Sequence, residues 1–329
     1  MQISLIASLS DTGGRSPIDA TVENLAQLHE EGFRRVWMTQ MPYEPDLLTV
    51  LAVAFREVDG IEVGTGVIPI QNQHPMLLAQ RALTLSLISG GRFLLGLGMT
   101  HAAVTEGMWG IPWDKPVRRL REYLDGLQPL LAGEPADAPG ETVTTRGALQ
   151  IPGATAPEVY IAALGPQLLK LAGRRTAGTV TWMTGPTTLA EHVAPTLREA
   201  AGERPVRVVA ALPVSVTDDV DGARAQAAKQ FAMYGHLPSY RAMLDREATP
   251  APRTRPSSAT KALWPNASEP SGRSVSMSMS GWCSTRRPKL EPAPGLCCAH
   301  FPDSRRRKPA RKTGLHGRFT SGRRVSAPV

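Results

Sequence analysis

His101 and Gln40 are the polar side chains best placed for chemistry, because each follows directly on an apolar segment of the chain. An imidazole has an unperturbed pKa near neutral pH, so His101 can give or take a proton during a reaction. Gln40 cannot transfer a proton efficiently, but its amide donates and accepts hydrogen bonds. A lone histidine is more often structural than catalytic, so the prediction depends on its surroundings. We predict His101 as an acid or base and Gln40 as a ligand-binding residue.

Glycine-rich turns follow the same apolar segments. Gly96 and Gly98 resemble the start of a dinucleotide-binding fingerprint, but the third glycine and the distal acidic residue are missing, which argues against a Rossmann-type nicotinamide site. A tight turn explains both glycines equally well. Gly165 and Pro166 open a predicted helix, where free N–H groups and the helix dipole favour an anion such as phosphate, although an ordinary turn also has this pattern.

Apolar strand-like segments alternate with helical ones along residues 1–247. The predicted strands cover residues 3–7, 35–39, 61–70, 92–97, 159–163, 179–182 and 206–216. The predicted helices cover residues 17–31, 46–55, 75–89, 117–131, 166–175, 187–201 and 221–234. Nearly continuous apolar strands indicate a parallel sheet covered by helices. An α/β fold of the TIM (β/α)8 barrel type follows, with about seven βα units present; an open doubly wound sheet is the alternative.

Ligand sites of such barrels lie on the loops that follow the strands. Trp37 and Trp182 end two of the predicted strands, and Thr184 follows the second of them. Either tryptophan can equally serve as a core or rim aromatic. We predict that both line a substrate pocket at this end of the barrel, next to His101.

The composition changes abruptly near Glu247. Of the 37 basic residues, 16 lie from Thr249 onward, together with three of the 29 acidic residues and all three cysteines. The first part is therefore slightly acidic and the second strongly basic. We divide the chain into a barrel domain, 1–247, and an Arg/Pro/Ser-rich tail of low order, 248–329, which replaces the eighth βα unit.

The tail does not have the pattern of a nucleic-acid or metal site. Its basic run at residues 305–312 lacks interleaved aromatics and a helical face, so a solvated charge run explains it better than phosphate binding. Cys283, Cys297 and Cys298 lack the paired spacing of a zinc site. We hypothesise that the tail arises from a reading-frame slip in a G+C-rich gene. The idea fails if neither alternative frame after codon 247 encodes a strand and an amphipathic helix; a genuine disordered arm is the other reading.

The first residues do not resemble a targeting segment. Residues 1–8 form a short strand-like run followed by Asp11, and the sequence has no apolar run of membrane-spanning length. The expectation is a cytoplasmic protein that binds neither membranes nor nucleic acid.

Three longer runs resemble the bacterial luciferase-like family of flavin and deazaflavin oxidoreductases, and most closely its branch that uses coenzyme F-420. These runs are Gly90-Gly91-Arg92-Phe93-Leu94-Leu95-Gly96-Leu97-Gly98, residues 162–173 beginning Ala162-Ala163-Leu164-Gly165-Pro166, and Gly178-Thr179-Val180-Thr181-Trp182-Met183-Thr184-Gly185-Pro186. The resemblance spans residues 1 to about 247.

The resemblance implies a TIM barrel whose mouth holds the tricyclic ring of the cofactor. A bulge in the third strand would back the ring, with a non-proline cis peptide at Gly66–Val67. The remaining cofactor-binding residues that it implies are Gly98, Ala162, Ala163, Gly165, Pro166 and Thr184. Relatives with an acidic residue and a histidine after the second strand differ from this chain, which has Thr39-Gln40-Met41 there, and no Glu follows Gly98. His101 is therefore the best available acid or base.

The implied reaction is hydride transfer between the deazaflavin and a small organic substrate, with the protein orienting the reactants and excluding water. One alternative is an oxygen-using monooxygenase that holds flavin mononucleotide (FMN). Another is a silent or merely cofactor-binding barrel, since a missing eighth unit would leave two sheet edges unpaired. Dimers are common among relatives, so a homodimer is expected.

Overall fold

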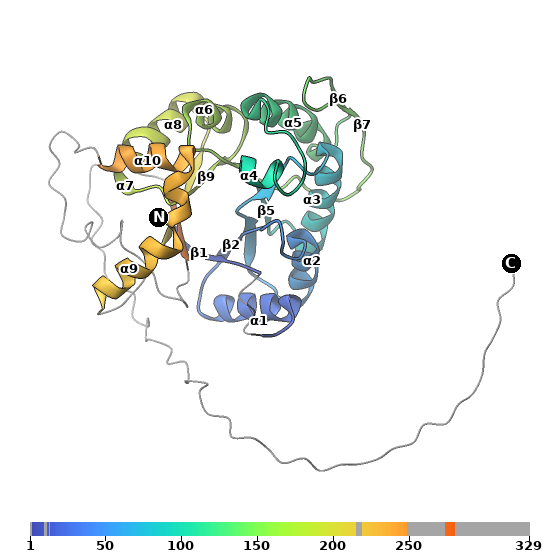
Figure 1. The fold of residues 1–329 in the computed structure, drawn as a ribbon. Coiled ribbons are helices and arrows are strands. Elements are labelled where there is room, and N and C mark those ends of the chain that lie inside the picture. The colour runs from blue at the N-terminus through green and yellow to red at the C-terminus, as the bar shows by residue number, and fades with distance from the viewer. Residues whose placement is uncertain (1, 10–11, 13, 215–218, 249–273, 280–329) are drawn as a thin grey trace, which may run out of the picture. The chain divides into compact units, whose positions relative to one another are not determined.

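A computed structural model describes residues 2–9, 12, 14–214, 219–248 and 274–279 (Figure 1). All of them belong to one compact unit, Met1–Cys283. The three cysteines and the basic run at residues 305–312 lie outside the described residues, as does most of the tail.

One mainly parallel sheet forms the centre of this unit (Figure 1). Its strands are β1 (Gln2–Ala7), β2 (Arg35–Met38), β3 (Glu62–Thr65), β4 (Ile68–Pro69), β5 (Phe93–Gly98), β8 (Val159–Ala162), β9 (Gly178–Trp182), β10 (Arg207–Pro213) and β11 (Ser274–Met279). The order is β3-β2-β1-β11-β10-β9-β8-β5-β4, and β3 also pairs with β5. This last pairing joins the ends of the sheet, so the strands enclose a barrel as predicted.

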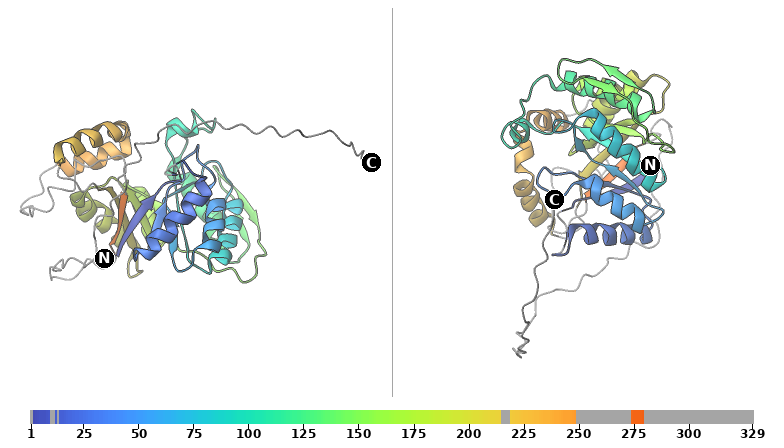
Figure 2. Two further views of the ribbon diagram at one scale, coloured as in Figure 1. Left: turned by 90° about the horizontal axis from the view of Figure 1, so that it is seen from below. Right: turned by 90° about the vertical axis from the view of Figure 1, so that its right-hand side faces the viewer.

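Helices alternate with the strands and lie on the outer face of the barrel (Figures 1 and 2). They are α1 (Pro17–Glu30), α2 (Leu47–Glu57), α3 (Pro75–Ser89), α5 (Pro116–Leu131), α6 (Pro166–Arg175) and α8 (Ala194–Ala201). Local signals account for several boundaries. Asp46 caps α2 by accepting a 2.9 Å hydrogen bond from the Thr49 amide, and Gly90 ends α3 in the left-handed conformation. Sequence and structure agree closely here.

Shorter elements lie at the barrel ends. α4 (Ala102–Thr105) follows β5, and the hairpin β6 (Ala136–Ala138) and β7 (Thr145–Gly147) occupies the long loop after α5. Helix α7 (Pro186–Thr188) and the π-helical turn η1 (Leu189–Val193) continue directly into α8. After β10 come α9 (Val220–Gln230), the 3-10 turn η2 (Ala232–His236) and α10 (Pro238–Ala248).

Two of these elements depart from the sequence-based prediction. The composition after Glu247 predicted only irregular chain, yet residues 274–279 form β11, which pairs antiparallel with both β1 and β10. The eighth position of the barrel is thus filled by an antiparallel strand from the tail. Helix α10 was also not predicted, and Glu247 is its penultimate residue.

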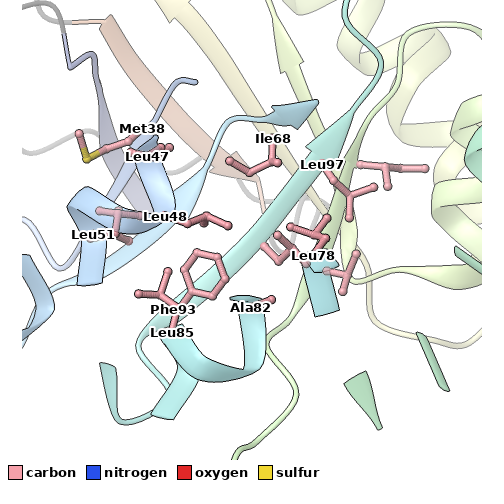
Figure 3. Close-up of a cluster of buried hydrophobic side chains, with 14 of the residues drawn as sticks. Met38, Leu47, Leu48, Leu51, Ile68, Leu78, Ala82, Leu85, Phe93 and Leu97 are labelled. Carbon is pink, nitrogen blue, oxygen red and sulfur yellow. The ribbon is translucent and has the colours of Figure 1, made fainter. Parts of the chain in front are cut away.

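Two apolar clusters stabilise the barrel. Trp37, Leu94, Tyr160, Val180 and Val209 fill its interior. The larger cluster lies between the sheet and the outer helices; Figure 3 shows the part where α2 and α3 pack on β2, β4 and β5. Among the helices that the structure describes, none is long and apolar enough to span a bilayer.

Candidate functional site

The third strand breaks at Gly66–Val67, between β3 and β4. The peptide bond between these residues is cis, as the family resemblance implied. The break is held from both sides: the Gly66 amide donates to the Met38 carbonyl at 2.7 Å, and the buried Thr65 hydroxyl donates to the Gly96 carbonyl at 2.7 Å. Thr65 Oγ1 also accepts from the Gly96 amide at 2.9 Å. The bulge is therefore a fixed part of the barrel end.

Val67, Gly98 and Ala162 meet beside this bulge, although they come from three different strand regions. A Cβ atom added at Gly98 would lie 2.9 Å from both Ala162 Cβ and Val67 Cγ2. Gly98 is buried, whereas Val67 and Ala162 are partly exposed. The structure thus brings together three residues that the sequence analysis assigned to a cofactor.

The loop from β8 into α6 continues the same edge of the barrel. Gly165 precedes the first residue of α6, Pro166, and no side chain caps this helix start. A Cβ atom at Gly165 would meet nothing within 4 Å, so the backbone there faces open space. The His192 ring Nε2 lies 2.9 Å from the Leu164 carbonyl oxygen and fixes the loop to the neighbouring helix. The open helix start can accept an anionic group.

His101 lies at the start of α4, immediately after β5, and is partly buried. Burial lowers the pKa of its imidazole below the ordinary value of 6.5. The ring faces Tyr240 of α10, with 6.0 Å between ring centroids. The lowered pKa favours the neutral ring, which can act as a proton acceptor.

A cluster of aromatic rings joins His101 to the end of β9. Trp182 packs on Phe231 at 6.2 Å and on Tyr234 at 6.5 Å, and Tyr234 packs on Tyr240 at 4.9 Å between centroids. Burial raises the pKa of both tyrosine hydroxyls, so they stay protonated. The left view of Figure 2 shows the orange helices α9 and α10 at the same barrel end as α4. Phe231, Tyr234 and Tyr240 were not predicted as site neighbours, because isolated aromatic residues follow no helical or strand period.

Comparison with known proteins agrees with this geometry. The family described as luciferase-like monooxygenase matches residues 3–274, most of the chain. The chain belongs to the luciferase-like monooxygenase family.

Two curated relatives indicate the kinds of protein that this luciferase-like chain resembles. A 5,10-methylenetetrahydromethanopterin reductase of Methanolobus tindarius is 30% identical over 215 residues, which cover 64% of this chain and 66% of the relative. A Mycobacterium tuberculosis protein that bears the provisional name coenzyme F420-dependent oxidoreductase is 36% identical over 121 residues, 37% of this chain and 35% of that protein. The matches thus span less than two thirds of the length of these curated relatives.

Solved structures share the luciferase-like fold. The coenzyme F420 dependent tetrahydromethanopterin reductase from Methanopyrus kandleri superposes with a TM-score of 0.61 at 23% identity, covering 75% of this chain and 76% of that one. The oxygenating constituent of 3,6-diketocamphane monooxygenase from Pseudomonas putida, in complex with FMN, gives 0.58 at 19% identity, covering 76% and 81%. Both support the barrel itself.

Gln40 makes hydrogen bonds within its own loop in this luciferase-like barrel. Its side-chain nitrogen donates to the carbonyls of Met41 at 2.8 Å and Pro45 at 3.2 Å, and its oxygen accepts from the Leu47 amide at 2.6 Å. Both ends of the amide are used within the loop from β2 to α2. Gln40 therefore shapes this loop and the start of α2, and it also lines the cavity between the loops that follow β2 and β4, so its ligand-binding role stays a prediction.

Trp37 differs from its predicted place in the wall of a substrate pocket. Its side chain is fully buried and packs edge-on against Tyr160, with ring centroids 5.4 Å apart. A Cβ atom at Gly66 would lie 3.8 Å from Trp37 Cβ, so the tryptophan lies beneath the bulge. Trp37 supports the floor of the site. Trp182, in contrast, is partly exposed at the barrel end.

Thr184 is nearly fully buried, and its hydroxyl donates to the Trp182 carbonyl at 3.3 Å. Ala163 is likewise buried, so a ligand would contact its backbone and not its side chain. In the parts of the chain that the structure describes, no three His, Cys, Asp or Glu side chains lie close enough to hold a metal ion.

A cavity of about 330 Å³ opens beside the bulge, between the loops that follow β2 and β4. Apolar side chains such as Met41, Leu77 and Trp109 line it together with Asn72 and Arg81. Its volume is at the small end of the range for ligand sites. A second cavity, of about 580 Å³, lies against α5 and contains none of the predicted site residues.

Proposed function

We propose that this chain is a coenzyme F-420-dependent oxidoreductase that exchanges a hydride with a small organic substrate at the carboxyl end of the barrel. The observation that carries the proposal is the convergence of Val67, Gly98 and Ala162 beside the break in the third strand. A side chain at Gly98 would clash with the other two, so the three residues pack together as a floor against which a flat ring would lie. The curated relative with an F420-dependent name supports the deazaflavin.

Backbone groups would hold the rest of the cofactor. The partly exposed backbone at Ala162, the amide of Ala163 and the uncapped start of α6 at Gly165 and Pro166 lie along one loop. The first N–H groups of a helix lack partners within the helix; Pro166 has no N–H, so an anionic group would accept from the amides on either side of it. Thr184 stabilises the neighbouring turn through its own hydrogen bond. The bound deazaflavin would supply two-electron hydride chemistry.

His101 would move the proton that accompanies the hydride. Its neutral ring accepts a proton from an alcohol being oxidised, and in the reverse direction its protonated ring donates one to a developing alkoxide. The aromatic rings of Trp182, Tyr234 and Tyr240 keep water away from this position and offer an apolar surface to the substrate. The substrate class is therefore a small, largely apolar carbonyl compound or alcohol.

An FMN-dependent monooxygenase is the second candidate. A fold neighbour at 19% identity is described in complex with FMN, and the same bulge could support either ring. The third reading, a silent barrel with unpaired edges, is weakened because β11 pairs with both β1 and β10. We keep the expectations of a homodimer and a cytoplasmic location as proposals.

Anaerobic turnover separates the candidates. The purified chain is mixed with reduced F-420 and a panel of small ketones and aldehydes in the absence of oxygen, and the return of oxidised deazaflavin absorbance is recorded. The proposal expects turnover that does not need oxygen and that falls strongly in His101→Gln. Turnover only with reduced FMN and oxygen would support the monooxygenase instead.

A further inference from the structure

The carboxylate of Glu247, near the end of α10, contacts the start of the helix that follows β9. It accepts hydrogen bonds from the Thr187 amide at 3.2 Å, the Thr188 amide at 2.9 Å and the Thr188 hydroxyl at 2.9 Å. Thr188 also donates to the Met243 carbonyl of α10 at 3.3 Å. A negative charge is favourable at a helix start, where N–H groups lack partners within the helix. The contact fixes one end of α10 to the barrel.

Gly185 leaves the space that this carboxylate occupies. A Cβ atom added at Gly185 would collide with the carboxylate carbon of Glu247. The backbone at Gly185 has φ −73°, a conformation that any residue adopts, so the glycine is not required by the turn. The absence of a side chain at Gly185 therefore makes room for the Glu247 carboxylate, and the backbone conformation does not require it.

Tyr240, Met243 and Glu247 lie three and four residues apart and share one face of α10. Met243 is buried and Glu247 holds the helix start beside it, while Tyr240 lies two turns away against His101 and Tyr234. A substitution that breaks the hydrogen bonds of Glu247 should therefore loosen the face of α10 on which Tyr240 lies.

We propose that Glu247 and Tyr240 act as positioning residues for His101: Glu247 holds α10 in place, and Tyr240 then covers the imidazole. The chemical meaning of this arrangement rests on the proposed function, since it keeps the proton-transfer group shielded from water. The contact itself does not depend on which cofactor binds.

The groups that face His101 are few. Tyr240 of α10 packs against its ring, and Tyr234 packs against Tyr240 in turn. Burial is the cause of the lowered pKa of His101, with no charged neighbour contributing among the described residues. Removing the cover should therefore return the pKa of His101 towards that of an exposed histidine.

The test is an NMR titration of the His101 ring protons in the full chain without cofactor, with the resonance assigned by its loss in His101→Gln. Glu247→Ala and Gly185→Ala should both raise the pKa of His101, the first by removing the carboxylate and the second by displacing it. Tyr240→Phe should leave the pKa unchanged and Tyr240→Ala should raise it. Glu199→Ala, at an exposed glutamate of α8, is the matched control and should have no effect.

An unchanged pKa of His101 in folded Glu247→Ala and Gly185→Ala would overturn the proposal. If circular dichroism shows that Glu247→Ala is unfolded, the pKa of His101 is measured in Gly185→Ala and Glu247→Asp instead. The shorter aspartate keeps the charge but cannot span the same distance, so it should also raise this pKa. The titration needs no turnover. A shifted pKa without F-420 activity would reject the proposed function alone, and activity with an unshifted pKa would reject the positioning role alone.

Discussion

Val67 Cγ2 lies 2.9 Å from the position that a Cβ atom at residue 98 would take, so the bulge of the third strand packs closely against Gly98. Ala162 approaches the same point from β8. Three strand regions therefore meet at one position that tolerates no added atom. This contact ties the turn after β5 to the part of the barrel that we assign to the cofactor.

Gly98→Ala should disturb the floor of the site. Adding a methyl group to a packed contact costs about 1–3 kcal/mol of stability, and the displacement falls on Val67 and Ala162. We expect a lower urea midpoint and weaker binding of F-420. Gly235→Ala is the control, because a Cβ atom there meets nothing within 4 Å. Equal F-420 affinity in both variants would remove Gly98 from the site.

His101 should influence both stability and activity with pH. Because burial lowers its pKa in the folded chain, the unfolded chain binds more protons, and its contribution to stability falls as pH drops below about 6.5. The free energy of unfolding should fall less on acidification in His101→Gln than in the wild type. Urea unfolding from pH 8 to pH 5 measures this difference. Loss of an acid or base typically lowers kcat by about 10²–10⁴-fold. Parallel pH dependence in the two proteins would contradict the burial of this ring.

Tyr160 and Tyr123 are both buried, but they differ in what their hydroxyls contact. The Tyr160 hydroxyl donates to Glu158 at 2.8 Å and accepts from Arg207 at 3.0 Å, whereas that of Tyr123 has no partner among the described residues. Tyr160→Phe should lower the free energy of unfolding by about 1–3 kcal/mol, since it leaves two charged groups with fewer hydrogen-bond partners. Tyr123→Phe should be neutral or stabilising. Thermal unfolding of the two variants compares them, and equal losses would show that hydrogen bonding is not the difference.

The same network affects the pKa of Glu158. Burial alone would raise it, but hydrogen bonds from Tyr160 and Arg207 and the charges of Arg207 and Arg35 lower it below the usual range. Glu158 therefore stays ionised, which is the form that pairs with Arg207 at 2.7 Å. The network lies at the end of β8 opposite the candidate site.

Much of the barrel could be predicted because its signals are local. Pro17 opens α1, Asp46 caps α2 and Gly90 ends α3, and each effect acts within one helical turn. Strand β11 could not be predicted in this way. Its sequence alternates serine with valine or methionine, and only Val275 among its residues is β-branched. The alternation is a strand signal with a period of two, but it is short and lies in an Arg/Pro/Ser-rich segment, and pairing with two distant strands selects it.

Part of the candidate site could also be predicted from the sequence. Family-specific runs pointed to Gly66–Val67, Gly98 and Ala162, and the structure brings them together. The hydrogen bonds that Gln40 makes within its own loop could not be predicted, because a glutamine looks the same in sequence whether its amide is free or bonded. Tyr240 was missed because its role depends on how α10 lies over His101, which is a tertiary contact.

Strand β11 makes a prediction about the tail. A chain that ends after residue 248 lacks the strand between β1 and β10, which exposes two sheet edges and favours aggregation. We expect a lower unfolding temperature and visible aggregation for this truncation, measured by differential scanning fluorimetry and light scattering. A chain that ends after residue 283 keeps β11 and should behave like the full protein. Identical behaviour of both truncations would show that the strand is dispensable.

The most direct measurement of the central claim is a competition titration with the full chain. F-420 is titrated into the wild-type protein by isothermal calorimetry, first without FMN and then in the presence of excess FMN. The titration without FMN is repeated with Gly98→Ala. The account predicts one F-420 per chain, little change when FMN is present, and clearly weaker binding by the variant. Binding of FMN with no detectable F-420 binding, or F-420 binding that Gly98→Ala leaves intact, would contradict it.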